Sequence, residues 1–180
     1  MRNCLFVLMF AALPVQADTR FLAGLGFAHG GDKLTTVEFT DGSSETLRAG
    51  SGIAFNAGVV HHFIDAPFSI QASFGYLLED TAASNSNIRF SRYPLEVLGF
   101  WRNGDHRFGG GLVHHFSPTF DMDNLGPGKV EFDDATGFAL EYGWRFISVR
   151  YTGIEYSFDT PFGSAKVDGN GLGVYLTYGF

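Results

Sequence analysis

The sequence predicts an all-β protein: a closed antiparallel up-and-down transmembrane β-barrel of about eight strands. Segments of roughly 10 residues, long enough to cross a bilayer at a tilt, place apolar side chains at every second position. The connections between these segments alternate between long and short. The last segment keeps its alternation up to the final residue, Phe180. Because a sheet in lipid must satisfy every backbone group, such strands have to close into a barrel.

The carboxyl-terminal segment, residues 171–180, has two clearly different faces. Successive side chains of a strand point to opposite sides, so alternate residues share a face. One face is small or polar, with glycine at 171, 173 and 179. The other is an unbroken apolar row, which we expect to face lipid: Leu172, Val174, Leu176, Tyr178 and Phe180.

Residues 1–17 have the three-part pattern of a cleaved secretory signal peptide. Arg2 precedes the apolar run 4–13, and Val15, Gln16 and Ala17 form a small-x-small ending. We therefore expect the barrel domain to comprise residues 18–180. No later stretch approaches the ~20 apolar residues of a spanning helix, so no helical anchor is predicted. The single cysteine, Cys4, lies in the leader, which leaves no disulfide or thiolate ligand in the mature chain.

Charge and composition narrow the function classes. Of 12 Lys and Arg residues, Arg2 falls in the leader, which leaves 11 against 19 Asp and Glu and a net charge of −8. Nucleic-acid binding depends on clustered basic residues and is not expected. Mean hydropathy is near neutral although the chain has 20 Phe. A barrel gives this average because apolar outer residues alternate with polar or small inner ones.

The first four strands are expected at residues 19–29, 52–61, 68–78 and 89–101. In the fourth, an outward row of Tyr93, Leu95, Val97 and Trp101 alternates with inward residues that include Leu98 and Phe100. Pro94 removes a ladder donor, so we expect a bulge nearby. Within the connection 30–50, residues 34–40 and 44–47 can extend the flanking strands as a hairpin.

The other four strands are expected at residues 107–116, 136–145, 149–158 and 171–180. The first has an inward row of Gly109, Gly111 and Val113. Asn103, Gly104 and Asp105 form a tight-turn sequence before it. The period of 149–158 breaks around Thr152 and Gly153, which is consistent with a bulge.

Long polar connections at residues 30–50, 79–87, 117–135 and 159–169 alternate with short ones near 63–67, 103–105 and 146–148. Outer-membrane barrels have this asymmetry, with short periplasmic turns and long outer loops. Aromatic residues near the strand ends are suited to the membrane interfaces. They are Trp101, Phe116, Tyr142, Trp144, Tyr178 and Phe180.

The terminal row ending in Phe180 resembles the assembly signal of bacterial outer-membrane β-barrels. The whole mature chain resembles the small eight-stranded class that contains OmpA-like transmembrane domains and opacity-type proteins. Residues 91–116, beginning Ser91-Arg92-Tyr93-Pro94, also resemble proteobacterial members of that class. The resemblance implies a Gram-negative outer-membrane location. It also implies outer-membrane lipid and lipopolysaccharide, periplasmic chaperones and the barrel assembly machinery as partners; it leaves the ligand of the loops open.

Charged residues fall on the inward rows of the middle strands. An eight-stranded barrel is just wide enough for side chains to fill it, and an unpaired buried charge costs several kcal/mol. We therefore predict an ionic plug rather than an open pore; the alternative places these residues in water at the rims. The predicted network comprises Arg92, Glu96, Glu141, Arg145, Arg150 and Glu155.

No metal or cofactor site is predicted. His61 and His62, like His114 and His115, are strand neighbours that point to opposite faces, and the two pairs lie at opposite ends of the barrel. The acidic loop residues do not have the spacing of a calcium loop, and we expect them to be solvated. They are Asp121, Asp123, Asp133 and Asp134.

One enzymatic alternative remains, a serine lipid hydrolase. His115 and Ser117 share a strand face, so the imidazole could activate the hydroxyl. The pair is similar to the His-x-Ser of outer-membrane lipid A deacylases, and Glu131 is a candidate third member. Pro118 and the mid-chain position depart from that family. A non-enzymatic structural, adhesive or small-solute role is therefore favoured, with a narrow passive channel as a further alternative.

Overall fold

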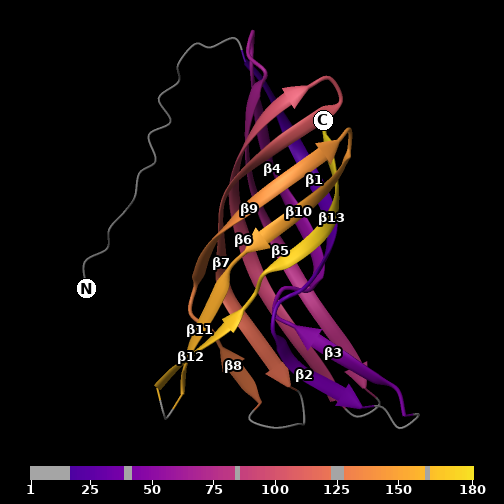
Figure 1. The fold of residues 1–180 in the computed structure, drawn as a ribbon, viewed down its shortest axis with the longest axis vertical. Coiled ribbons are helices and arrows are strands. Elements are labelled where there is room, and N and C mark those ends of the chain that lie inside the picture. Colours follow the sequence, from indigo (N-terminus) through magenta and orange to yellow (C-terminus); the bar gives the residue numbers. More distant parts are fainter. Residues whose placement is uncertain (1–16, 39–41, 84–85, 123–127, 161–162) are drawn as a thin grey trace.

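The computed structural model describes residues 17–38, 42–83, 86–122, 128–160 and 163–180. Its main body is a closed antiparallel barrel of eight strands (Figure 1), which confirms the predicted fold class. The barrel strands are β1 (Ala17–His29), β4 (Gly52–Phe63), β5 (Phe68–Ala83), β6 (Ser86–Asn103), β7 (His106–Met122), β9 (Ala135–Trp144), β10 (Ile147–Gly153) and β13 (Gly171–Gly179). Each barrel strand overlaps one of the predicted strands.

The two ends of the sheet join through β1 and β13. β1 pairs with β4 on one edge, and with β13 on the other from Leu22 opposite Gly179 to His29 opposite Leu172. The predicted signal peptide lies outside the described residues apart from Ala17. No helix in the described part of the chain is long and apolar enough to cross a membrane.

The outside of the barrel is apolar. The rows predicted to face outward are exposed on every strand, as shown by Phe55 at 54 %, Val97 at 50 % and Leu172 at 59 %. The alternate residues of the same strands, such as Leu98 and Tyr175, are buried in the interior. The barrel therefore has the inside-out distribution that a lipid environment requires.

The two ends of the barrel differ in structure. The turns after β4, β6 and β9 are short and lie at one end with the carboxyl terminus, which we call the turn end. Figure 1 shows the other strands at the opposite end, the cap end: β2 (Lys33–Glu38), β3 (Ser44–Arg48), β8 (Lys129–Glu131), β11 (Glu155–Thr160) and β12 (Gly163–Asp168). The predicted short connections are confirmed. Of the predicted long ones, 30–50, 117–135 and 159–169 include cap strands, whereas most of 79–87 belongs to β5 and β6 themselves.

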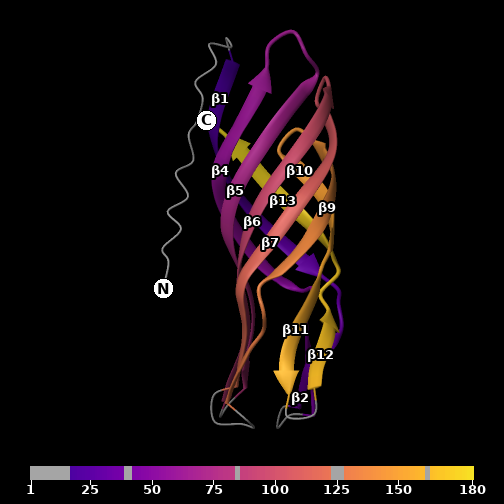
Figure 2. The same cartoon turned by 90° about the vertical axis from the view of Figure 1, so that its left-hand side faces the viewer.

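The long connections are not the polar loops that we expected. β5, β6 and β7 continue beyond the barrel as one sheet that β8 extends, and β11 pairs with β12 (Figure 2). Much of residues 79–87 and 159–169, predicted as loops, is strand. The β2–β3 hairpin matches the predicted one, although residues 39–41 lie outside the described part of the chain.

These cap strands share an apolar core. It contains Val37, Leu47, Ala49, Ile88, Phe90, Phe120, Phe132, Ala135, Ile154 and Tyr156. The rings of Phe132 and Tyr156 meet that of Phe90 edge-on, with centroids 5.6 and 5.7 Å away. The connections contain enough apolar side chains to bury against one another, so they form a folded cap.

Local breaks occur where the sequence indicated them. The β6–β7 register shifts between Ser91 and Tyr93, beside Pro94, and Gly104 has a φ of 59° in the turn before β7. The predicted strand 149–158 divides at Ile154, one residue after the expected break. Its second half, β11, leaves the barrel and pairs only with β12.

We expect Phe90→Ala to loosen the cap while the barrel stays closed. Phe90 is 0 % exposed, and its truncation removes the ring against which Phe132 and Tyr156 pack, a loss of about 3–5 kcal/mol. Hydrogen exchange of the refolded protein in detergent should accelerate in β8, β11 and β12 and stay slow in β1 and β13. Phe74→Ala, on the exposed outer face, is the control. Unchanged exchange throughout the cap would contradict the shared core.

Candidate functional site

The barrel interior holds an ionic cluster centred on Arg150. Its Nη1 lies 2.6 Å from Glu96 Oε1, and its Nη2 lies 2.6 Å from Glu141 Oε2. All three side chains are buried, with 1, 9 and 0 % of their surfaces exposed. β10, β9 and β6 place them there because each residue lies on the inward row of its strand. One guanidinium thus bridges two carboxylates across the lumen.

Two further residues complete the cluster. Arg107 Nη2 donates to Glu141 Oε1 at 2.8 Å, and Ser73 Oγ donates to Glu96 Oε2 at 3.1 Å. Our sequence analysis missed Arg107. The inward row of Gly109, Gly111 and Val113 contained the necessary indication, because one more step back along that row reaches residue 107. The cluster therefore has two cations and two anions.

A tyrosine and a glycine shape the wall beside the cluster. The guanidinium of Arg150 lies 4.3 Å from the centre of the Tyr175 ring, a cation–π arrangement. That ring occupies the space next to Gly26, where any Cβ would collide with it. The small inward residues of β1 therefore make room for a large aromatic side chain from β13.

Arg92, a member of the predicted network, does not join the ionic cluster. Arg92 is 1 % exposed, but it lies at the junction of barrel and cap, where Nη2 donates to the Ser51 carbonyl at 2.7 Å. Its guanidinium also lies 4.5 Å from the centre of the Phe90 ring. Among the described residues, its Nε and Nη1 have no hydrogen-bond partner. Arg92 faces inward as predicted, but it lies four residues before Glu96 on β6, with Pro94 between them on the same inward face.

Two other residues of the predicted network lie outside the lumen cluster. Arg145, with a φ of 55°, sits in the turn after β9 and pairs with Asp105 at 3.0 Å. Glu155 pairs with Lys166 at 2.7 Å in the cap, because the chain leaves the barrel at Ile154. Both pairs are exposed to solvent. These two residues therefore lie in water outside the lumen, as in the alternative prediction, and are not part of an ionic plug.

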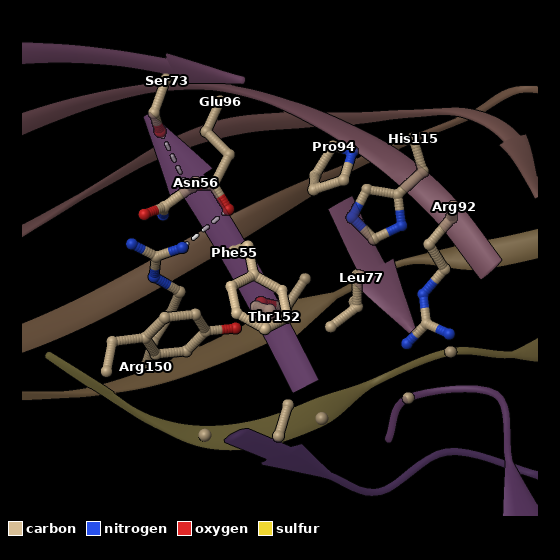
Figure 3. Close-up of a pocket in the computed structure, with 17 residues that line it drawn as sticks. Phe55, Asn56, Ser73, Leu77, Arg92, Pro94, Glu96, His115, Arg150 and Thr152 are labelled. Carbon is tan, nitrogen blue, oxygen red and sulfur yellow. Dashed lines mark hydrogen bonds and ion pairs between the residues drawn. The ribbon is translucent and has the colours of Figure 1, made fainter. Parts of the chain in front are cut away.

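Above the cluster the lumen is almost filled. A cavity of about 30 Å³, roughly the volume of one water molecule, separates the cluster from the base of the cap. Figure 3 shows Arg150 and Glu96 on one side of it and Arg92 and His115 on the other. The described side chains thus leave no wide passage between the cap and the cluster.

The candidate catalytic residues are not brought together. His115 is 4 % exposed and its Nδ1 lies 2.6 Å from the Tyr156 hydroxyl. Burial raises the pKa of the Tyr156 phenol, so this hydroxyl stays protonated. Ser117 is exposed, and Glu131 pairs with Lys129 at the cap surface. The φ of Ser117, 46°, breaks the alternation that would have placed it on the same face as His115.

The remaining histidine and aspartate candidates have separate partners. His61, His62 and His114 contact Thr19, Arg102 and Thr136, respectively. Asp133 accepts a hydrogen bond from the Ser157 hydroxyl and Asp134 accepts one from the Ser117 amide; Asp123 lies outside the described residues. Within the described ranges, no three His, Cys, Asp or Glu side chains gather as a metal site.

An eight-stranded closed barrel with an apolar outer surface and an ionic interior is the architecture of a small β-barrel of the outer-membrane type. No protein-family model matches the sequence, and no curated protein matches it. The chain is similar in structure to the solved structure of Ail, the attachment invasion locus protein of Yersinia pestis, in complex with the heparin analogue sucrose octasulfate. The identity is 15 %, the match covers 89 % of this chain and 97 % of that one, and the TM-score is 0.48. Neisserial surface protein A matches at 9 % identity over 90 % of this chain and 99 % of that one, with a TM-score of 0.45.

Removal of the central cation should strongly destabilise the barrel. Arg150→Met leaves two carboxylates buried without their shared partner, so we expect a loss of about 3–5 kcal/mol in the free energy of unfolding. Urea unfolding of the refolded protein in detergent micelles measures it. Adding Glu96→Gln and Glu141→Gln to Arg150→Met should restore part of the loss, because the two buried carboxylates become neutral and only Arg107, 19 % exposed, is left without its partner.

Arg145→Gln is the matched control, because its exposed pair with Asp105 contributes only about 0–1 kcal/mol. Equal losses for Arg150→Met and Arg145→Gln, or no recovery in the triple variant, would show that the cluster does not stabilise the barrel.

Proposed function

We propose that this protein resides in the outer membrane and uses its sealed barrel as a rigid scaffold that presents the folded cap at the cell surface, in a structural or adhesive role. The observation that carries the proposal is the filled interior. The ionic cluster and the cap core together block the axis that a solute would have to follow. What remains accessible on the outer side is the cap.

The surface of the barrel supports the membrane part of the proposal. Its exposed apolar rows run around all eight strands. Near the turn end, the ring of Phe108 contacts those of Trp101 and Tyr142, with centroids 6.3 and 4.7 Å away. Clustered aromatic rings at this depth are typical of a membrane interface. The short turns would then face the periplasm and the cap the exterior.

The cap supports the display part of the proposal. Its strands are tied to the barrel by β5, β6 and β7, and its core is buried, so surface side chains are held on a firm base. Cross-strand ion pairs cover this base, including Arg89 with Asp80 and Lys166 with Glu155. Binding residues commonly occupy variable segments on such rigid scaffolds.

The alternative functions have less support from the structure. A passive channel needs a continuous path, and the lumen beside Arg150 is occupied. A lipid hydrolase needs a base next to its nucleophile, whereas His115 points inward to Tyr156 and Ser117 points to solvent. No feature of the described residues favours either alternative over a closed scaffold.

A sealed scaffold should not conduct. In planar bilayers, the purified full-length protein should give no steady large single-channel current at moderate voltage. Glu96→Ala combined with Arg150→Ala, which removes two side chains of the ionic cluster, should raise the conductance if the double variant still refolds. A steady large current from the unmodified protein would refute the sealed barrel.

The proposed orientation can be tested with introduced cysteines, because the only cysteine of the chain is Cys4. On intact cells, a membrane-impermeant maleimide should label Lys166→Cys, whose native side chain is 68 % exposed in the cap. Asn103→Cys, exposed at the turn end, should be labelled only after permeabilisation. The unmodified protein is the blank. The reverse labelling pattern would invert the orientation, and labelling of neither variant in any fraction would argue against surface display.

A further inference from the structure

The turn end of the barrel contains a second cavity, which shares Arg107 with the ionic cluster. It has a volume of about 250 Å³ and is lined in part by the turns after β6 and β9, so it lies on the other side of the ionic cluster from the cap. Four arginines line it: Arg20, Arg102, Arg107 and Arg145. The only carboxylate among its lining residues is Asp105. We call this cavity the basic vestibule.

Three of the four arginines have a carboxylate partner. Arg20 pairs with Asp18 at 2.5 Å, Arg145 with Asp105 at 3.0 Å, and Arg107 with Glu141 at 2.8 Å. Within the described part of the chain, Arg102 has no carboxylate at ion-pair distance. Its Nη1 instead donates to Nδ1 of His62 at 2.8 Å. The vestibule therefore has one positive charge in excess, centred on Arg102.

The contact with Arg102 also determines which nitrogen of the His62 imidazole carries the proton. A guanidinium has no acceptor, so Nδ1 of His62 must accept the hydrogen bond. The proton of the neutral ring then lies on Nε2, which makes it a donor. His62 lines the vestibule, so the ring adds a neutral N–H donor next to the unpaired cation.

The inner wall of the vestibule is polar and shielded from water. Ser69 and Gln71 line it from β5, and each is 3 % exposed. The Arg107 side chain, 19 % exposed, crosses this wall with its stem against Gly143, and its Nη2 donates to Glu141. Buried donors bind an anion more strongly than donors in bulk water, because the local dielectric constant is lower.

We propose that the basic vestibule is a binding site for a small oxyanion of the phosphate class. Arg102 supplies the uncompensated charge, and Arg107, His62, Ser69 and Gln71 supply donors around it. The volume is below the ~300–1,000 Å³ typical of pockets for larger organic ligands, which favours a small anion with some water. The ionic cluster closes the inner side, so the site holds an anion and does not pass it through the barrel.

This site goes beyond the proposed scaffold function and does not depend on the orientation of the barrel. The same phosphate chemistry is available from a free ion and from a phospholipid headgroup at the membrane surface. The experiment therefore compares inorganic phosphate in nonionic detergent micelles with nanodiscs of phosphatidylglycerol and of phosphatidylcholine.

Titration calorimetry of the refolded full-length chain with inorganic phosphate, at constant ionic strength, should show saturable binding to one site. Arg102→Gln should weaken it by about tenfold or more, since a charge-assisted hydrogen bond contributes roughly 1.5–3 kcal/mol. Arg102 is exposed, so this variant should refold; Arg102→Lys, which keeps the charge, should lose less. Arg89→Gln removes one cation from the cap and should bind as the unmodified protein does.

Two results would overturn the proposal: no saturable heat from the unmodified protein, or equal weakening in Arg102→Gln and Arg89→Gln. If phosphatidylglycerol nanodiscs suppress the binding of inorganic phosphate more than phosphatidylcholine nanodiscs do, an anionic lipid headgroup competes for the site and is a source of the phosphate group. Equal binding in micelles and in both nanodiscs identifies the free ion as the ligand. Either of the last two results supports the site.

Discussion

Closure of the sheet between β1 and β13 is the constraint on which the rest of the structure depends. Once eight strands close, the interior is only wide enough for side chains. The polar and charged side chains of the inward rows must therefore find their hydrogen-bond and ion-pair partners among one another. Glu96 and Glu141 enter that space from β6 and β9, and a single guanidinium from β10 neutralises both. A large side chain on one strand lies opposite a small residue on its neighbour, so Tyr175 fits because Gly26 has no side chain. The ionic cluster is therefore a consequence of closure as much as of sequence.

Much of the barrel could be predicted from the sequence because its strands obey a simple two-residue rule. Outward Val97 and inward Leu98 follow directly from the alternation, and so do the inward positions of Glu96, Glu141 and Arg150. Three of the positions that were predicted wrongly lie where the backbone departs from that rule. Ser117 and Arg145 have positive φ values, and Ile154 interrupts the path from β10 to β11. Each departure turns the following side chains to another face or out of the barrel, and periodicity alone does not reveal it.

The shared core of the cap could not be predicted from the alternation of residues, for a different reason. Its core joins residues from hairpins that are remote in sequence, such as Leu47 of β3, Phe132 after β8 and Tyr156 of β11. Residues 44–47 and 149–158 were expected to form strands, but alternation over such short stretches does not show that these side chains meet in one core. Arg92 shows the same limitation, because its burial under the cap depends on contacts with Ser51 and Phe90. Only the assembled structure shows that barrel and cap share this residue.

The continuity of β5, β6 and β7 has a mechanical consequence. These strands have 16, 18 and 17 residues and run without interruption from the barrel into the cap sheet. A force that pulled the cap away from the barrel would act along these strands, so the backbone hydrogen bonds that join β5 to β4 and β7 to β9 would resist it in parallel. A cap attached only through flexible linkers would instead yield at its weakest junction. Tension on this molecule would therefore load the ladders in shear, the direction in which a β-sheet is stiffest.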